Sequence, residues 1–64
     1  MPVISAERIQ QRYDAILDAA KQVFTRQGYE GTSIAAVAKV AGVSDGLIYR
    51  YFANKRDLLD QALF

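Results

Sequence analysis

Residues 33–55 read SIAAVAKVAGVSDGLIYRYFANK, and this stretch decides the fold. Over 34–41 the apolar residues recur at steps of three and four, which is the spacing of one buried helix face. Gly42 can then adopt the positive φ that ends a helix, and Ser44 can cap the next one. The stretch therefore predicts a short helix over about 34–41 and a second over about 45–52, joined by a tight turn.

Two short helices joined by a three- to four-residue turn that contains glycine form the helix-turn-helix arrangement. The first helix of such a pair braces against the DNA backbone, and the second presents its N-terminal part to the major groove. Ala38 and Gly42 fit this geometry, because a small residue lets the helices approach closely and glycine tolerates the turn. Residues 33–52 are therefore predicted to form a helix-turn-helix, with Ser33 as the N-cap of its first helix.

One helix is predicted on each side of this motif. The preceding helix is expected over about 6–26, with Ser5 as its N-cap and Gly28 as its left-handed stop. Its apolar stripe follows helical spacing and comprises Ile9, Tyr13, Ile16, Leu17, Ala20, Val23 and Phe24. The following helix is expected to begin after Asn54, and its apolar side consists of Leu58, Leu59, Ala62 and Leu63. These elements predict an all-α fold: a three-helix bundle with a helix-turn-helix, plus the start of a fourth helix.

The outward face of the helix at 45–52 differs from an ordinary solvated helix face, which would show Glu, Lys and Gln. Its residues are Gly46, Leu47, Tyr49, Arg50 and Tyr51. Arginine can fork onto guanine, tyrosine hydroxyls suit phosphate oxygens, and an apolar tip such as Leu47 can meet a thymine methyl group. Lys55 adds a cation at the start of the last helix, where the helix N-terminus already attracts anions. In the alternative interpretation the tyrosines are packing residues and Leu47 is an isolated exposed apolar residue.

Composition removes several classes of function. The chain has 64 residues, of which 8 are basic and 7 acidic, and it contains no Cys, His or Trp. Those absences exclude disulfide scaffolds, zinc fingers, thiol redox motifs and imidazole bases, so we expect no metal site, no cofactor and no enzyme activity. Asp14 and Asp18, one turn apart in the first helix, are interpreted as a solvated pair. No apolar run approaches the about 18 residues of a transmembrane helix, so we expect a cytoplasmic protein without a membrane partner.

Residues 41–55, AGVSDGLIYRYFANK, resemble the DNA-binding domain of tetracycline-repressor-like (TetR-family) transcriptional regulators, and the resemblance covers about residues 9–63. It implies that residues 1–64 form a TetR-type, homeodomain-like DNA-binding domain. It also implies that the larger C-terminal domain of the family, which binds a small effector and dimerises, is absent from this chain. The parent protein would then be a homodimeric, ligand-responsive regulator, most simply a repressor, that binds palindromic double-stranded operator DNA and releases it when the effector binds.

The resemblance also implies which residues contact DNA. In the family, these contacts come from the start of the second helix, the recognition helix and the start of the fourth helix. The matching positions here are Thr32, Ser33, Gly46, Tyr49, Arg50, Tyr51 and Lys55. Asp45 and Leu47 depart from the family pattern, which often has Lys, Pro or Gln at the first position and Thr or Ser at the second. We include both in the candidate interface, although capping of its own helix is the favoured role for Asp45.

A second class of function fits the same pattern: a small helical protein-interaction module without a DNA role. Leu47 and Tyr49 would then form a partner-facing patch. Residues 28–56 hold four basic and two acidic residues, an excess that is compatible with nucleic acid without demanding it. Salt dependence separates the two classes, because DNA binding weakens steeply through counterion release and an apolar contact need not. Little apolar surface is left over for a second copy, so the 64-residue chain is expected to be a monomer.

Overall fold

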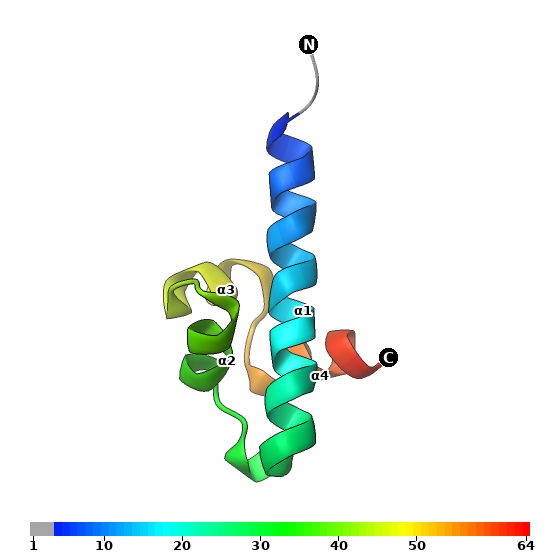
Figure 1. The fold of residues 1–64 in the computed structure, drawn as a ribbon, viewed down its shortest axis with the longest axis vertical. Helices are drawn as coiled ribbons and strands as arrows, with labels where there is room; N and C mark the ends of the chain where they lie inside the picture. Colours follow the sequence, from blue (N-terminus) through cyan, green and yellow to red (C-terminus); the bar gives the residue numbers. More distant parts are fainter. Residues whose placement is uncertain (1–3) are drawn as a thin grey trace.

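The computed structural model describes residues 4–64 of the chain, and side chains from residue 8 onward. Its helices are α1 (Ile4–Gly31), α2 (Ile34–Ala41), α3 (Asp45–Tyr51) and α4 (Lys55–Leu63), and no strand occurs among the described residues. α1 packs against α2 and α4, and α2 packs against α3. Figure 1 shows α2 and α3 on one side of α1, with α4 crossing α1. The predicted all-α bundle, with a helix-turn-helix followed by a fourth helix, is confirmed.

α1 is longer than the sequence predicted at both ends. It begins at Ile4, so Ser5 already lies inside the helix and the predicted N-cap is wrong. Gly28 has φ 73° and ψ −178°, which interrupts the helix where a stop was predicted, and helical structure then continues to Gly31. This combination of angles is open to glycine and strained for other residues. At about 1.5 Å per residue, α1 accounts for most of the 44 Å length of the molecule.

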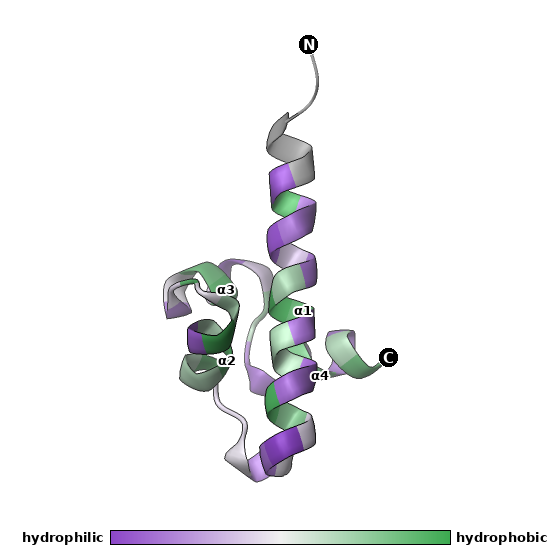
Figure 2. Ribbon diagram, viewed as in Figure 1, coloured by the Kyte–Doolittle hydropathy of each residue, from purple (hydrophilic) through white to green (hydrophobic). Residues whose placement is uncertain are grey.

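The predicted apolar stripe of α1 is confirmed only where other helices reach it. Its buried or partly buried members are Tyr13, Ile16, Leu17, Ala20, Val23 and Phe24. Ile9 is 54% exposed, so its predicted place in the core is wrong. The reason is length: α2 and α4 have only eight and nine residues, and α1 extends beyond them toward its N-terminus. Figure 2 shows the hydrophobic residues of α1 concentrated where it passes the other helices.

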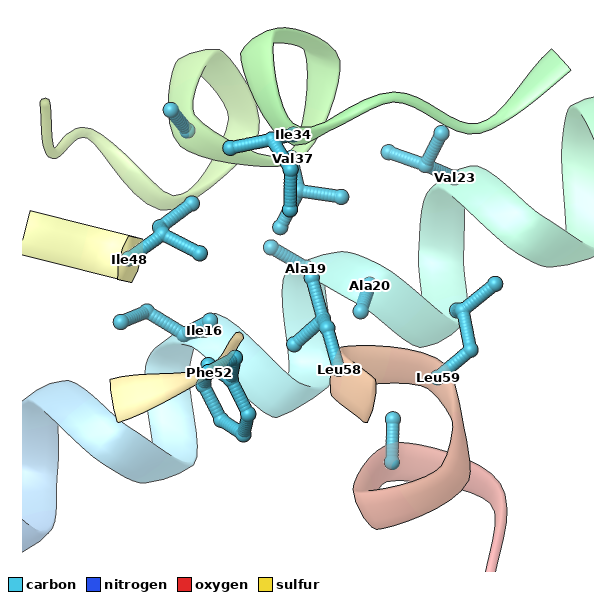
Figure 3. Close-up of a cluster of buried hydrophobic side chains, with 12 residues drawn as sticks. Ile16, Ala19, Ala20, Val23, Ile34, Val37, Ile48, Phe52, Leu58 and Leu59 are labelled. Carbon is cyan, nitrogen blue, oxygen red and sulfur yellow. The ribbon is translucent and has the colours of Figure 1, made fainter. Parts of the chain in front are cut away.

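Each helix contributes one fully buried large apolar side chain to the core. Ile16, Val37, Ile48 and Leu58 come from α1 to α4 in turn, and each is fully buried (Figure 3). Full burial of such a side chain contributes about 1.5–3 kcal/mol to folding. Alanines fill the spaces between these four residues, where a small side chain lets the helix axes approach. They are Ala19, Ala20, Ala38 and Ala62, of which Ala19 was not in the predicted stripe.

Local capping sets the ends of the three short helices. Ser33, Ser44 and Asn54 each accept a hydrogen bond from the backbone N–H three residues later, at 3.0, 3.1 and 2.8 Å. Gly42 ends α2 in the left-handed conformation, with φ 74° and ψ 31°. The predicted bounds of α2 are therefore confirmed residue for residue. α3 ends one residue earlier than predicted, because Phe52 has extended angles and forms its C-cap.

Candidate nucleic-acid interface

The turn between α2 and α3 holds the second helix of the pair against the first. The backbone N–H groups of Gly42 and Val43 both donate to the carbonyl oxygen of Ala38, the second at 3.0 Å. Ser44 then starts α3 with its side-chain cap. Because each of these bonds is made within the turn, local chemistry determines where α2 ends and where α3 begins. The predicted helix-turn-helix geometry over 33–52 is present.

The face of α3 that points away from the core matches most of the prediction. Ile48 is fully buried on the inner side. The residues exposed on the outer side are Asp45, Gly46, Tyr49 and Arg50, and Leu47 is partly buried. Tyr49 keeps 55% of its surface exposed, so its ring is free of the core. α3 therefore presents a short surface with a phenol hydroxyl and a guanidinium from consecutive residues, Tyr49 and Arg50, and a glycine, Gly46, about one turn before them.

Tyr51 lies in a packed environment. Its ring contacts Tyr13 of α1 in an edge-to-face arrangement, with 6.0 Å between ring centroids and an interplanar angle of 71°. It also lies against Phe52, at 6.3 Å between centroids. The alternative interpretation, in which the tyrosines of this helix are packing residues, therefore holds for the ring of Tyr51 and fails for that of Tyr49.

Thr32 is buried, which argues against its predicted role as a DNA contact. Only 1% of its surface is exposed, and its hydroxyl donates to the carbonyl oxygen of Gly28 at 2.7 Å. Its backbone N–H donates to the carbonyl oxygen of Tyr29 at 3.2 Å. The hydroxyl and the backbone N–H of Thr32 thus both form hydrogen bonds at the end of α1. Ser33 differs, because it is exposed and a hydroxyl that accepts a capping bond can still donate its own proton.

Lys55 is half-buried and already bound within the chain. Its ammonium group donates to the carbonyl oxygen of Tyr29 at 2.8 Å and lies 4.1 Å from the centroid of the Tyr29 ring. A hydrogen bond and a cation–π contact together tie the first turn of α4 to the end of α1. The ammonium carries three N–H groups, so two remain for an anion. Sequence reasoning missed this pair, because its members are 26 residues apart and no local spacing links them.

Asp45 is exposed in the first turn of α3, and the cap of that helix is Ser44 instead. The prediction that Asp45 caps α3 is therefore wrong. A carboxylate in a first turn still interacts favourably with the helix dipole, which gives it a role independent of DNA. At the start of α4, the carboxylate of Asp57 accepts from the backbone N–H of Ala53 at 2.9 Å, and the backbone N–H of Asp57 donates to the side chain of Asn54 at 2.8 Å.

Other features of the described residues lie apart from this face. A hollow of about 330 Å³ is lined only by residues of α1 and α4, namely Phe24, Tyr29, Arg56, Leu59, Asp60 and Leu63. Asp14 and Asp18 are both exposed on α1, as predicted for a solvated pair. Within residues 4–64, no cluster of acidic side chains is arranged to hold a metal ion, and none of the helices is long and apolar enough to cross a membrane.

Comparison with known proteins matches the chain over residues 16–62 to the tetR family of bacterial regulatory proteins. It is 48% identical over 48 residues to the fatty acid metabolism regulator protein of Bacillus subtilis, an alignment that covers 75% of this chain and 25% of that protein. It is 40% identical over 60 residues to the transcriptional repressor KstR of Mycobacterium tuberculosis, covering 94% of this chain and 27% of KstR.

A solved structure agrees with these sequence matches. The fatty acid degradation regulator FadR of Bacillus halodurans superposes with a TM-score of 0.77 at 49% identity, over 80% of this chain and 27% of FadR. The chain thus spans about a quarter of the length of the relatives it matches. It belongs to the tetR family of bacterial regulatory proteins, whose members regulate transcription by binding DNA.

Proposed function

We propose that this chain is the DNA-reading head of a ligand-responsive transcriptional regulator, most simply a repressor, and that α3 enters the major groove. The observation that carries the proposal is the arrangement of α3, which has one buried residue, Ile48, while Tyr49 and Arg50 face solvent. A guanidinium placed in this way suits the O6 and N7 atoms of guanine. Family membership supports the same role for the chain as a whole.

Asp45 keeps its role at the dipole of α3, and other residues of the outer surface have DNA-binding roles that their environments permit. Leu47 meets a thymine methyl group with the part of its side chain that stays exposed. The hydroxyls of Ser33 and Tyr49 donate to phosphate oxygens, and the free N–H groups of Lys55 do the same. Thr32 is left out of the interface because it is buried. Tyr51 is left out because its ring packs against α1.

Gly46 has no internal reason to be glycine. A Cβ built there would meet only the Ser44 hydroxyl oxygen, at 3.9 Å, which is an ordinary contact. Glycine in a helix lowers folding stability by about 0.5–1 kcal/mol relative to alanine. Nothing in the fold requires glycine at this position to offset that loss. Close approach of the DNA backbone to α3 would supply the missing reason.

Gly46→Ala is therefore expected to stabilise the chain by up to about 1 kcal/mol while weakening DNA binding. An added methyl group in a tight contact typically costs about 1–3 kcal/mol. Urea denaturation and DNA titration of the same variant measure the two effects. A variant that is more stable and binds DNA as tightly as the wild type would show that the DNA does not approach this position.

Lys55→Ala is expected to weaken binding to all DNA sequences alike, because a phosphate contact orients the protein on the DNA and does not discriminate between base sequences. The slope of log K against log salt should flatten by about one unit. Tyr29→Leu is the matched control: it removes the ring beneath the ammonium and keeps the charge, so it should lower stability and leave the salt slope unchanged. An unchanged slope in Lys55→Ala would instead assign the ammonium to the fold alone.

For the full-length protein, we propose a homodimer whose further domain binds a small-molecule effector and joins two heads on a palindromic operator. Family membership and the length of the relatives, of which this chain spans about a quarter, support this. Joining two heads makes the second binding event intramolecular, which raises affinity by about 10²–10⁴. The 64-residue chain should lack this factor and behave as a monomer.

Titration of labelled duplexes with the wild-type chain tests the proposed function. A half-site and a palindrome, chosen by selection from random DNA, should be bound with similar affinity per site. Binding should weaken linearly on a log–log scale between about 50 and 200 mM salt. Sedimentation should give a monomer. Absence of a sequence preference, with weak salt dependence, would favour the protein-interaction module instead.

A further inference from the structure

Three aromatic rings join α1 to the end of α3. Tyr13 of α1 stacks on Phe52, with 5.4 Å between ring centroids and an interplanar angle of 23°. It meets Tyr51 edge to face at 6.0 Å, and Tyr51 and Phe52 lie 6.3 Å apart. We call Tyr13, Tyr51 and Phe52 the ring cluster. Offset and edge-to-face pairs at these distances are attractive and directional, so the cluster favours particular relative orientations of its members.

α3 has few other contacts that could set its orientation relative to α1. It has seven residues, and Ile48 is the buried one. Its main packing partner is α2, whereas α1 packs against α2 and α4. One buried side chain fixes where a helix sits but leaves its tilt about that point free. The second point of attachment is the C-terminal end of α3, where Tyr51 and Phe52 meet Tyr13.

The ring of Tyr13 matters more in this arrangement than its hydroxyl. The hydroxyl donates to Oε1 of Gln61 on α4 at 3.5 Å, which is long for a bond between oxygens. The two ring contacts, in contrast, lie within the range of favourable aromatic pairs. Removal of the hydroxyl alone should therefore leave α3 in place, and removal of the ring should not.

We propose that Tyr13 is a positioning residue for DNA recognition: its ring holds the end of α3 so that Arg50, which directly precedes Tyr51, faces the groove. The inference rests on the proposed function, since it names a determinant of the same DNA-reading surface. Tyr13 acts through Tyr51 and Phe52 and needs no contact of its own with DNA. A loss of the ring would let α3 tilt, which moves the guanidinium relative to the bases while its charge stays near the phosphates.

The test compares Tyr13→Leu with Tyr13→Phe and with the control Val23→Ala. Val23 is also buried on α1, but it lies ten residues further along, about 15 Å at 1.5 Å per residue. The measured quantity is the ratio of affinities for a duplex selected by the wild type and for an unrelated duplex. The amide NMR shifts of residues 45–51 without DNA report the position of α3. Far-UV circular dichroism checks that each variant is folded.

Tyr13→Leu is expected to lower the affinity ratio about tenfold, the discrimination of roughly one base contact, and to shift the α3 amides. Tyr13→Phe keeps the ring, so its affinity ratio should stay within about twofold of the wild-type value, less than the loss of one base contact. Val23→Ala should lower the melting temperature and keep the ratio. A melting temperature reports stability alone, so the ratio separates a positioning role from a merely structural one.

Several outcomes would overturn the inference. These are an unchanged ratio in Tyr13→Leu, an equal loss in Val23→Ala, or a lost preference in Tyr13→Phe. An unfolded Tyr13→Leu chain would assign the ring to the stability of the fold and not to the orientation of α3. If the wild-type chain itself shows no sequence preference, the proposed function fails, while the amide shifts still decide whether Tyr13 positions α3.

Discussion

Replacement of Ile48 by alanine is expected to unfold much of the chain at room temperature. Ile48 is fully buried between α3 and the rest of the core. An isoleucine-to-alanine change in such a site costs about 2–5 kcal/mol. A single core in a chain of this size rarely supplies more than about 3–5 kcal/mol in total, so the loss is comparable with the whole stability. Urea denaturation followed by far-UV circular dichroism measures it.

Tyr49→Ala is the matched control for this prediction. Tyr49 follows Ile48 on the same helix and keeps 55% of its surface exposed. A substitution at such a site should change the free energy of unfolding by no more than about 0.5 kcal/mol. If the two variants lost the same stability, α3 would not be packed on the core through Ile48, and the outer surface described here would be misplaced.

Arg50→Ala is expected to remove most of the sequence preference at one position of each half-site. A bidentate contact with guanine contributes about 1–3 kcal/mol of discrimination, which corresponds to roughly 5- to 150-fold in relative affinity. Binding to unrelated DNA should fall much less, since only one positive charge is lost. Parallel selections from random DNA with the wild type and the variant measure the preference directly.

Lys21→Ala is the control for Arg50→Ala, because it also removes one positive charge but at a site away from α3. Lys21 is exposed on α1, on the side of the helix that also carries Asp14 and Asp18. It should leave both the preferred sequence and the affinity close to those of the wild type. Equal consensus sequences from Arg50→Ala and the wild type would remove Arg50 from the base-reading role, whatever happens to overall affinity.

The elements whose ends are set by neighbouring residues could be predicted from the sequence. α2 is the example: Ser33 and Gly42 define its ends by bonds to residues at most four positions away, and its bounds are as predicted. Ser5 failed as a cap because α1 already includes Ile4, and serine is tolerated inside a helix as well as at its cap. Ile9 failed because the length of the partner helices, and not its own spacing, decides whether it is covered.

The candidate interface also contains residues that local spacing could place and residues whose surroundings depend on contacts distant in sequence. Tyr49 and Arg50 could be placed on the outer face from helical spacing alone, because α3 buries only one side. The environments of Thr32 and Lys55 depend on how the chain closes at the end of α1. Thr32 turns its hydroxyl back to Gly28, and Lys55 reaches Tyr29 across 26 residues. Such contacts form only when the helices pack together, so residue type and local spacing do not reveal them.

The extension of α1 beyond its partner helices has a consequence for how the chain melts. Residues 8–12 are exposed, yet they continue a helix that is already nucleated by the packed part of α1. Their helical state therefore depends only on propagation, which adds one backbone bond per residue and weakens with temperature. The packed bundle should unfold in one cooperative step, whereas these turns shorten residue by residue. Ellipticity at 222 nm should thus drift with a pronounced slope before the main transition, while aromatic signals from the ring cluster stay flat.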